Sequence, residues 1–112
     1  MDIDILRNDE MPDKLKEVKP QIKQLYYKGN IENLSMPSIA IIGSRSCTSQ
    51  GMRIAKNISK SLTRAGFCII SGMAKGIDSA AHMGCLEAGG KTIAVMRRWI
   101  WTYIPKRKYW IV

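Results

Sequence analysis

The chain has 112 residues, of which 46% are hydrophobic and 24% are charged. These values are ordinary for one small globular domain or a fragment of a larger one, and they exclude wholesale disorder and collagen-like repeats. Lys and Arg outnumber Asp and Glu by 18 to 9, which gives a formal charge of +9. A basic balance favours polyanionic partners, but it says nothing about the fold.

The sequence predicts a soluble cytoplasmic protein. Its apolar runs, such as residues 39–42, are far shorter than the roughly 18 residues of a membrane-spanning helix. The acidic start MDIDILRNDE lacks the basic and apolar regions of a signal peptide. Cys47, Cys68 and Cys85 match no zinc spacing, and His82 is the single histidine, so we expect reduced thiols and no metal site.

Charge divides the chain into three parts. Residues 1–38 carry six basic and seven acidic side chains, whereas residues 39–96 carry seven basic and two acidic ones. Residues 97–112 carry five basic side chains and no acidic one. We interpret these parts as an N-terminal lead-in, a central α/β region and a basic tail rich in tryptophan.

The predicted elements follow in chain order. The lead-in contains a short helix around residues 13–17 and a short strand at residues 24–28. In the centre, apolar runs predict strands, and apolar residues spaced by three or four predict helices. The central order is strand 39–42, helix 50–65, strand 67–70, helix 77–88 and strand 91–95.

Several residues mark the ends of the first central helix. Thr48 or Ser49 could cap its N-terminus, because a side-chain oxygen there can accept from free backbone N–H groups. Gly66 should end the helix in a left-handed conformation.

This order of elements predicts the fold class. Apolar strands that alternate with helices imply right-handed crossovers and a parallel sheet covered on both faces. The run at residues 39–42 is continuous and mostly β-branched, which is typical of a strand buried on both faces. We therefore expect an α/β fold: a Rossmann-like parallel sheet with helices on both faces, of which only the first half is present.

Familiar catalytic and cofactor motifs are absent. GGKT at residues 89–92 resembles the end of a P-loop, but Cys85 stands where the first glycine belongs, and the segment leads from a helix into a strand. No G-x-G-x-x-G follows the first central strand, and no G-x-S-x-G supports a serine hydrolase. We predict no catalytic residue and no cofactor.

Two loops carry the candidate chemistry, because ligands of open parallel sheets bind beyond the carboxyl ends of the strands. The first is Gly43-Ser44-Arg45, and the second spans residues 71–76 and contains Lys75. Arg45 offers a planar fork for phosphate, and Lys75 offers a mobile positive charge. Since neighbouring strands lie about 5 Å apart, the two side chains should share successive phosphates of one ligand. The simpler alternative for each is a solvated surface residue.

Other polar residues have structural interpretations. Asp78, in the first turn of the second helix, is most simply a cap and dipole partner. His82 is more simply a packed or helix-supporting histidine than an acid or base. The basic stripe on the first helix is most simply a solvated face, and it comprises Arg53, Lys56, Lys60 and Arg64.

Three motifs closely resemble the DprA/Smf family, the DNA-processing proteins of bacterial natural transformation. They are IAIIGSR at residues 39–45, SGMAKGIDSAAHMGCLEAGG at residues 71–90 and KTIAV at residues 91–95. The lead-in fits the family's Pro-x-x-Leu and Leu-Tyr-x-x-Gly segments, so the resemblance covers roughly residues 11–96. The matching lead-in residues are Pro12, Leu15, Leu25, Tyr26 and Gly29.

The resemblance implies an extended Rossmann domain that binds single-stranded DNA, helps to load a RecA-type recombinase and is not an enzyme. Residues 39–96 would then be a partial Rossmann-like DNA-binding domain. The intact family forms homodimers, through a region that is largely missing here. The resemblance places Arg45 and Lys75 in the family's DNA-binding pocket, and the residues that would shape its phosphate contacts are Gly43, Ser44, Ser71, Gly72 and Gly76.

The resemblance breaks after about residue 96. There the family continues with a glycine-rich loop and a Tyr-Pro segment, whereas this chain has RRWIWTYIPKRKYWIV. We hypothesise a frameshift, which an intact family-like frame in the genomic DNA immediately downstream would support and unrelated sequence there would exclude.

Two alternative functions remain open. One is a nucleotide-processing Rossmann enzyme similar to the lysine-decarboxylase-like phosphoribohydrolases. That family carries a P-G-G-x-G-T-x-x-E segment with its catalytic glutamate, and this chain has no such run. The other is an inactive truncated gene product.

Overall fold

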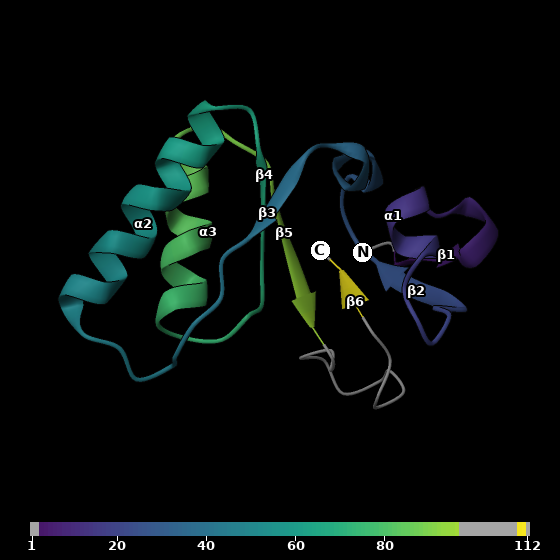
Figure 1. The fold of residues 1–112 in the computed structure, drawn as a ribbon, viewed down its shortest axis with the longest axis horizontal. Coiled ribbons are helices and arrows are strands. Elements are labelled where there is room, and N and C mark those ends of the chain that lie inside the picture. Colours follow the sequence, from purple (N-terminus) through teal and green to yellow (C-terminus); the bar gives the residue numbers. More distant parts are fainter. Residues whose placement is uncertain (1–2, 97–109, 112) are drawn as a thin grey trace.

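The computed structural model describes residues 3–96 and 110–111 of the chain. In this part, six strands form one sheet in the order β1-β2-β6-β5-β4-β3 (Figure 1). The strands are β1 (Asp4–Arg7), β2 (Gln24–Tyr27), β3 (Ser38–Ala40), β4 (Cys68–Ser71), β5 (Thr92–Met96) and β6 (Trp110–Ile111). The α-helices are α1 (Asp13–Lys16), α2 (Ser49–Arg64) and α3 (Ile77–Glu87), and two 3-10 helices, η1 (Asn8–Glu10) and η2 (Ile31–Ser35), lie in the lead-in.

The central half of the sheet is parallel, which confirms the predicted α/β class. Strand β4 pairs in parallel with β3 on one side and with β5 on the other. The remaining strands make the sheet mixed, because β1 is antiparallel to β2, and β6 is parallel to β2 but antiparallel to β5. Apart from β6, the predicted tail at residues 97–112 lies outside the described residues.

The two long helices lie side by side on one side of the parallel strands, and the lead-in lies on the other (Figure 1). Since β3, β4 and β5 are adjacent in chain order, two successive right-handed crossovers place α2 and α3 on the same face. The second face packs instead against the lead-in with its short helices. The core cluster there comprises Leu6, Met11, Leu25, Leu34, Cys68 and Ile93. Helices therefore lie on both faces of the sheet: two long helices on one face and the short helices of the lead-in on the other.

Small residues let α2 and α3 pack closely. A Cβ atom added at Gly84 would collide with the carbonyl oxygen of Lys56, so a larger residue there would force the helices apart. The hydroxyl of Ser59, which is fully buried, donates to the carbonyl oxygen of Ala81. These contacts hold the middle and the C-terminal half of α3 close to α2.

The predicted ends of α2 are confirmed. Thr48 Oγ1 accepts from the N–H of Gly51 at 2.9 Å, which satisfies one of the free donors of the first turn. The helix ends before Gly66, whose φ of +99° is favourable only for glycine.

One prediction for the first central strand is wrong. The sequence predicts that residues 39–42 are buried on both faces, but Ala40 and Ile42, which share one face, are exposed. Ile42 follows the strand and is 74% exposed. A β-branched run indicates apolar character, but it does not indicate whether another element packs on each face of the strand. The strand β1 and the two 3-10 helices were also not predicted.

Candidate functional site

The two predicted loops meet at the carboxyl ends of β3 and β4. Gly76, in the second loop, has a φ of +80°, and a Cβ atom at this position would lie 2.5 Å from the carbonyl oxygen of Ser44 and 2.9 Å from that of Arg45. The next residue, Ile77, donates its N–H to the same Ser44 oxygen at 3.3 Å. A glycine is therefore required at position 76 because two backbones touch there.

Asp78 joins the two loops from the first turn of α3. Its carboxylate is buried and accepts from the N–H of Gly43 at 3.4 Å. On the other side, a Cβ atom at Gly72 would lie 2.6 Å from Asp78 Oδ2. The carboxylate thus reaches a hydrogen-bond donor on the other loop, and the interpretation of Asp78 as a simple helix cap misses this connection.

His82 fixes the second loop from one turn further along α3. Its Nε2 lies 2.7 Å from the carbonyl oxygen of Gly72, and its Nδ1 lies 2.7 Å from Thr92 Oγ1. The hydroxyl of Thr92 also lies 2.8 Å from the carbonyl oxygen of Ile69, to which it donates. The packed interpretation of His82 agrees with this geometry, in which the imidazole ties the loop to β5. Nothing in the sequence near Thr92 signals its part in this contact.

Ser71 connects the two strands beneath the loops. Its side chain is 2% exposed, and its hydroxyl donates to the carbonyl oxygen of Ile41 at 2.5 Å. In contrast, Ser44 is exposed, and its hydroxyl both donates to the carbonyl oxygen of Ser46 and accepts from the N–H of Ser46. Ser71 therefore positions the backbone, whereas Ser44 shapes the surface of the first loop.

Arg45 and Lys75 are the exposed cations of the two loops. Among the described residues, neither side chain has an ion pair or hydrogen bond with protein. A cation without a protein partner at the N-terminal end of α2 or α3 suits an anionic ligand, because the helix termini add partial positive charge. The backbone contact at Gly76 brings the loops that carry Arg45 and Lys75 together.

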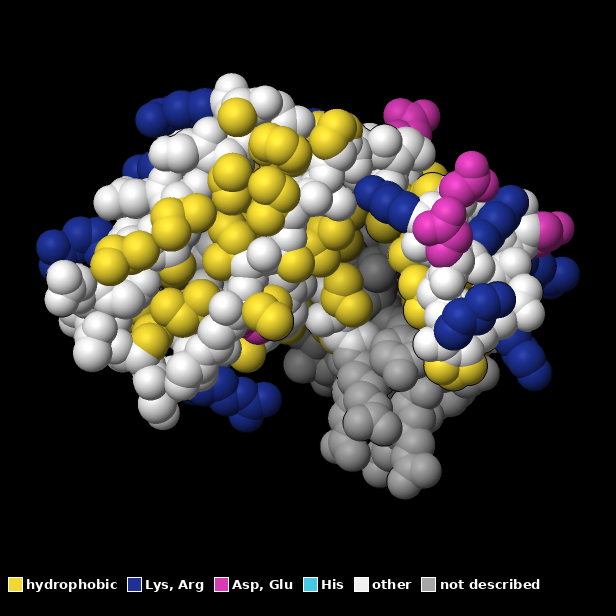
Figure 2. All heavy atoms as spheres, viewed as in Figure 1, with side chains coloured by type: hydrophobic (Ala, Val, Ile, Leu, Met, Phe, Trp, Pro, Cys, Tyr) yellow, Lys and Arg dark blue, Asp and Glu magenta, His cyan; other side chains and the backbone are white. Residues whose placement is uncertain are grey.

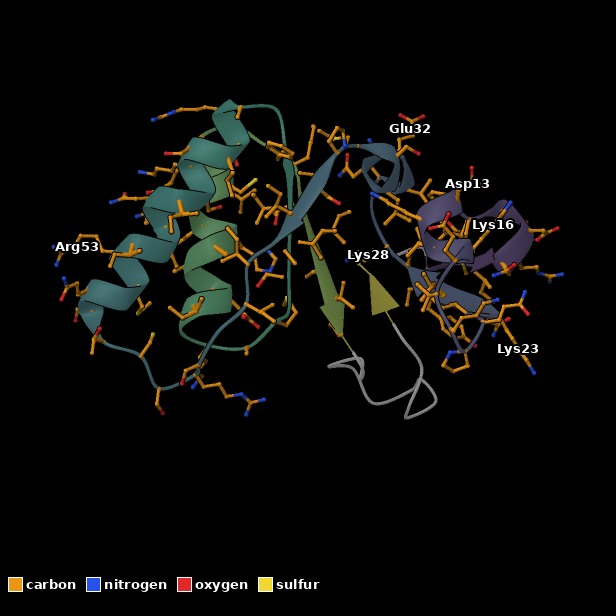
Figure 3. The ribbon with its side chains drawn as sticks, viewed as in Figure 1. Asp13, Lys16, Lys23, Lys28, Glu32 and Arg53 are labelled. Carbon is orange, nitrogen blue, oxygen red and sulfur yellow. The ribbon has the colours of Figure 1, made fainter. Side chains whose placement is uncertain are left out.

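The basic stripe of α2 differs from Arg45 and Lys75, because two of its lysines have an acidic partner. Lys56 and Lys60 contact Glu87 of α3, with N–O distances of 2.9 and 3.4 Å. The hydrogen bond from Lys56 lowers the pKa of Glu87 below its ordinary value, against the opposing effect of desolvation. Arg53 instead projects from α2 away from the sheet (Figure 3). Half of the stripe is thus used within the fold.

All seven predicted site residues lie on these two adjoining loops or at the strand end beneath them. Their contact with a ligand stays a prediction. The residues that sequence reasoning assigned no role at the site, Asp78, His82 and Thr92, are the ones that hold the loops in place.

The cysteines lie outside this arrangement. All three are free, and burial raises the pKa of the Cys68 thiol, so it is held as the neutral form. The described residues contain no group of side chains that could together hold a metal ion. No helix of that part is both long and apolar enough to cross a membrane.

The fold and the site together define a class: a Rossmann-like α/β protein whose candidate site is a pair of basic, glycine-containing loops beyond two parallel strands. The family model described as DNA recombination-mediator protein A matches residues 3–111. The chain belongs to this family.

Relatives agree with this assignment. The DNA processing protein DprA of Streptococcus pneumoniae is 41% identical over 99 residues, which are 88% of this chain and 35% of that protein. Protein Smf of Synechocystis is 42% identical over 76 residues, 64% of this chain and 19% of its own length. The chain therefore spans about a third or less of the length of these two relatives.

Two solved structures have the same fold. The X-ray structure of DprA from Streptococcus pneumoniae superimposes with a TM-score of 0.81 at 34% identity, covering 97% of this chain and 43% of that one. A structure of DNA processing protein A from Helicobacter pylori, described for its single-stranded DNA binding mode, gives a TM-score of 0.73 at 24% identity. It covers 97% of this chain and 54% of that one, and at this identity it supports the fold alone.

Proposed function

We propose that the chain binds single-stranded DNA, without a chemical step, through the two loops at the carboxyl ends of β3 and β4. The observation that carries this proposal is the contact of the two loops at Gly76 and Ser44, with Arg45 and Lys75 exposed and unpaired beside it. Proteins that bind single strands combine a cationic groove, which follows the phosphate backbone, with side chains that contact the bases. Backbone N–H groups also commonly donate to phosphates.

The residues have separate roles in this proposal. Arg45 and Lys75 neutralise successive phosphates. Gly43, Gly72 and Gly76 shape the loops that present them, because a Cβ atom at each would collide with a neighbouring part of the protein. Ser44 provides a hydroxyl at the surface, and Ser71 keeps the strand ends together from below. Membership in a family of recombination mediators supports the ligand class.

The rival enzyme finds no support at this site. A phosphoribohydrolase needs a carboxylate that can act as a base near the ligand. Glu87 lies at the opposite end of α3 from the loops and is paired with Lys56 and Lys60. Asp78 is buried, with Gly43 as its partner.

The test is the binding of a fluorescein-labelled oligo-dT, measured by anisotropy over a salt series. Arg45→Ala and Lys75→Ala should each weaken binding and reduce the slope of log affinity against log salt by about 0.7 per lost phosphate contact. The matched controls are Arg64→Ala at the far end of α2 and Lys23→Ala in the lead-in, where Figure 3 shows Lys23 far from α2. Equal effects of all four variants would indicate binding by diffuse positive charge and contradict the proposed site.

Delivery of the bound strand to a RecA-type recombinase in the cytoplasm is the wider role that we propose for this family member, and the family's description as a mediator supports it. Recombinase should form filaments faster when it is added to the complex of the chain with oligo-dT than when it is added to oligo-dT alone. A homodimer, as the resemblance implies for the intact family, would appear as a doubled mass in light scattering.

A further inference from the structure

His82 has more hydrogen-bond acceptors around it than a neutral imidazole can satisfy. Its Nε2 lies 2.7 Å from the carbonyl oxygen of Gly72, and a carbonyl oxygen only accepts, so Nε2 carries a proton. Its Nδ1 lies 2.7 Å from Thr92 Oγ1, which donates its own proton to the carbonyl oxygen of Ile69 at 2.8 Å. Thr92 must then accept from Nδ1–H. All three bonds form together only when both ring nitrogens carry protons, which makes His82 an imidazolium.

A neutral His82 gives up one of these bonds. If Nε2 keeps the proton, the hydroxyl of Thr92 has to turn from Ile69 towards Nδ1. If Nδ1 keeps the proton, the carbonyl oxygen of Gly72 loses its donor, and α3 no longer holds the second loop at this point. The proton on His82 is therefore coupled to the position of the loop that carries Lys75.

Solvent reaches the imidazole through a pocket beside α3. His82 is half-buried and lines this pocket of about 410 Å³ together with Met73 and Leu86, which are 54% and 63% exposed. The other lining residues are uncharged: Ala74, Ser79, Thr92 and Ala94. The ring can thus exchange its proton with water, and the pocket lining supplies no second acid or base.

The bond from His82 acts on the peptide that joins Gly72 to Met73. In a trans peptide the C=O and the N–H point in opposite directions, so the N–H of Met73 points away from the imidazole. In the part of the chain that the structure describes, the N–H groups of Met73, Ala74 and Lys75 have no hydrogen-bond partner. A cation that holds the carbonyl oxygen polarises this peptide, which makes its N–H a stronger donor to an anion.

Asp78 places a negative charge behind the same loop. It lies one turn before His82 on α3, and a Cβ atom at Gly72 would lie 2.6 Å from its Oδ2. An imidazolium offsets this charge, whereas a neutral ring leaves it to repel a phosphate. On β4, the buried thiol of Cys68 is held neutral. Figure 2 shows basic side chains at the edge of the molecule where the parallel strands end. The exposed cations of the elements around His82 are Arg45, Lys75 and Lys91.

We propose that His82 is a positioning residue whose protonation strengthens the binding of a DNA phosphate to the second loop. The imidazolium acts through the Gly72 carbonyl and by offsetting the charge of Asp78, without touching the DNA. This inference rests on the proposed function, because Lys75 and the free N–H groups beside it belong to the proposed DNA site. Since the protonated form binds more tightly, the affinity is highest in mild acid and falls as the pH rises through the range in which histidine loses its proton.

The first experiment measures the affinity for oligo-dT by anisotropy at constant ionic strength, with a rhodamine label whose emission does not depend on pH. The chain is purified without a histidine tag. We expect the affinity to fall about fivefold between about pH 5 and pH 8. Histidine is the side chain whose ordinary pKa lies in this range, and His82 is the single histidine of the chain.

The second experiment follows the imidazole of His82 by NMR in the free chain and with saturating oligo-dT. Because binding and protonation are linked, DNA should move the midpoint of the titration to higher pH, by about 0.7 of a pH unit for a fivefold effect. Residues that only support the fold do not produce this reciprocal change.

Three variants make the test specific. His82→Gln keeps a donor for the Gly72 carbonyl but carries no charge, so its affinity should not depend on pH. Thr92→Val removes the acceptor of Nδ1–H and should lose most of the pH dependence, whereas Thr92→Ser keeps the hydroxyl and should retain it. Circular dichroism at each pH shows whether the variants are folded, and the NMR titration needs no substitution.

The outcomes separate this inference from the proposed function. Binding that depends on Arg45 but not on pH would overturn the role of His82 and leave the proposed function standing. An equal pH dependence in His82→Gln, or a titration midpoint that oligo-dT does not move, would also overturn it. Absence of binding to oligo-dT at every pH would overturn both.

Discussion

Replacement of Gly76 by alanine tests the contact between the two loops. Its φ of +80° and ψ of −124° disfavour an L residue by about 1–3 kcal/mol. The new Cβ would also lie 2.5 Å from the carbonyl oxygen of Ser44, so the loops must separate and the bond from the Ile77 N–H to that oxygen is lost. Since a hydrogen bond of this kind contributes about 1 kcal/mol, we expect Gly76→Ala to lower the free energy of unfolding by about 2–4 kcal/mol.

Gly89 provides a control that also has a positive φ but has no close contact. Its φ is +74°, and a Cβ atom there would meet no atom within 4 Å. Gly89→Ala should therefore cost only the strain, about 1–2 kcal/mol. The difference between the variants, about 1 kcal/mol, corresponds to roughly 4–8 °C in Tm for a small domain.

Urea denaturation and thermal melts followed by circular dichroism measure this difference, and anisotropy with oligo-dT measures its consequence. Gly76→Ala should weaken DNA binding at a temperature where both variants are folded, while Gly89→Ala should bind as the unsubstituted chain does. Equal losses of stability in the two variants would refute the close contact of the loops.

Three further predictions concern the elements that support the site. His82→Ala and Thr92→Val should show a coupling energy of about 0.5–3 kcal/mol in a double-mutant cycle of unfolding, and additive effects would contradict their contact. Because its lysine partner lowers the pKa of Glu87, the stabilisation that Glu87→Gln removes is present above the ordinary value of 4.5 and is lost as the pH falls through the lowered folded value. The small difference in Tm between Glu87→Gln and the unsubstituted chain should thus close in acid and at high salt, and a difference unaffected by pH would exclude the ion pair as its cause. Ser59→Ala should cost about 1 kcal/mol, measured by urea denaturation, whereas exposed Ser61→Ala should change stability by less than about 0.5 kcal/mol; similar values would argue against the buried bond.

Local patterns predicted the elements of the central region well. Thr48 caps α2 and Gly66 follows its end because both effects depend on a few adjacent residues. The parallel order of β3, β4 and β5 also follows from chain order, since right-handed crossovers leave few alternatives. The two loops were found for the same reason: they come directly after predicted strands.

Contacts between residues far apart in the chain were not predicted from the sequence. The exposure of Ile42 depends on which elements pack over its face of the sheet, and the partner of the Asp78 carboxylate is a backbone N–H 35 positions away. His82 is one turn from Asp78 on α3, yet its role is set by Gly72 and by Thr92 of β5. Residue spacing along the chain does not predict such pairings, because they form only once the strands are aligned in the sheet.

The core cluster that joins the lead-in to the sheet has a consequence for synthesis of the chain. Leu6, Met11, Leu25 and Leu34 leave the ribosome before Ile93, their partner on β5, which follows Leu34 by 59 positions. At about 5–20 residues per second, Leu34 waits roughly 3–12 seconds for the surface that buries it, and the three earlier side chains wait longer. During that interval the nascent lead-in displays apolar groups that a chaperone can hold, so depletion of ribosome-associated chaperones should reduce the soluble yield of the chain.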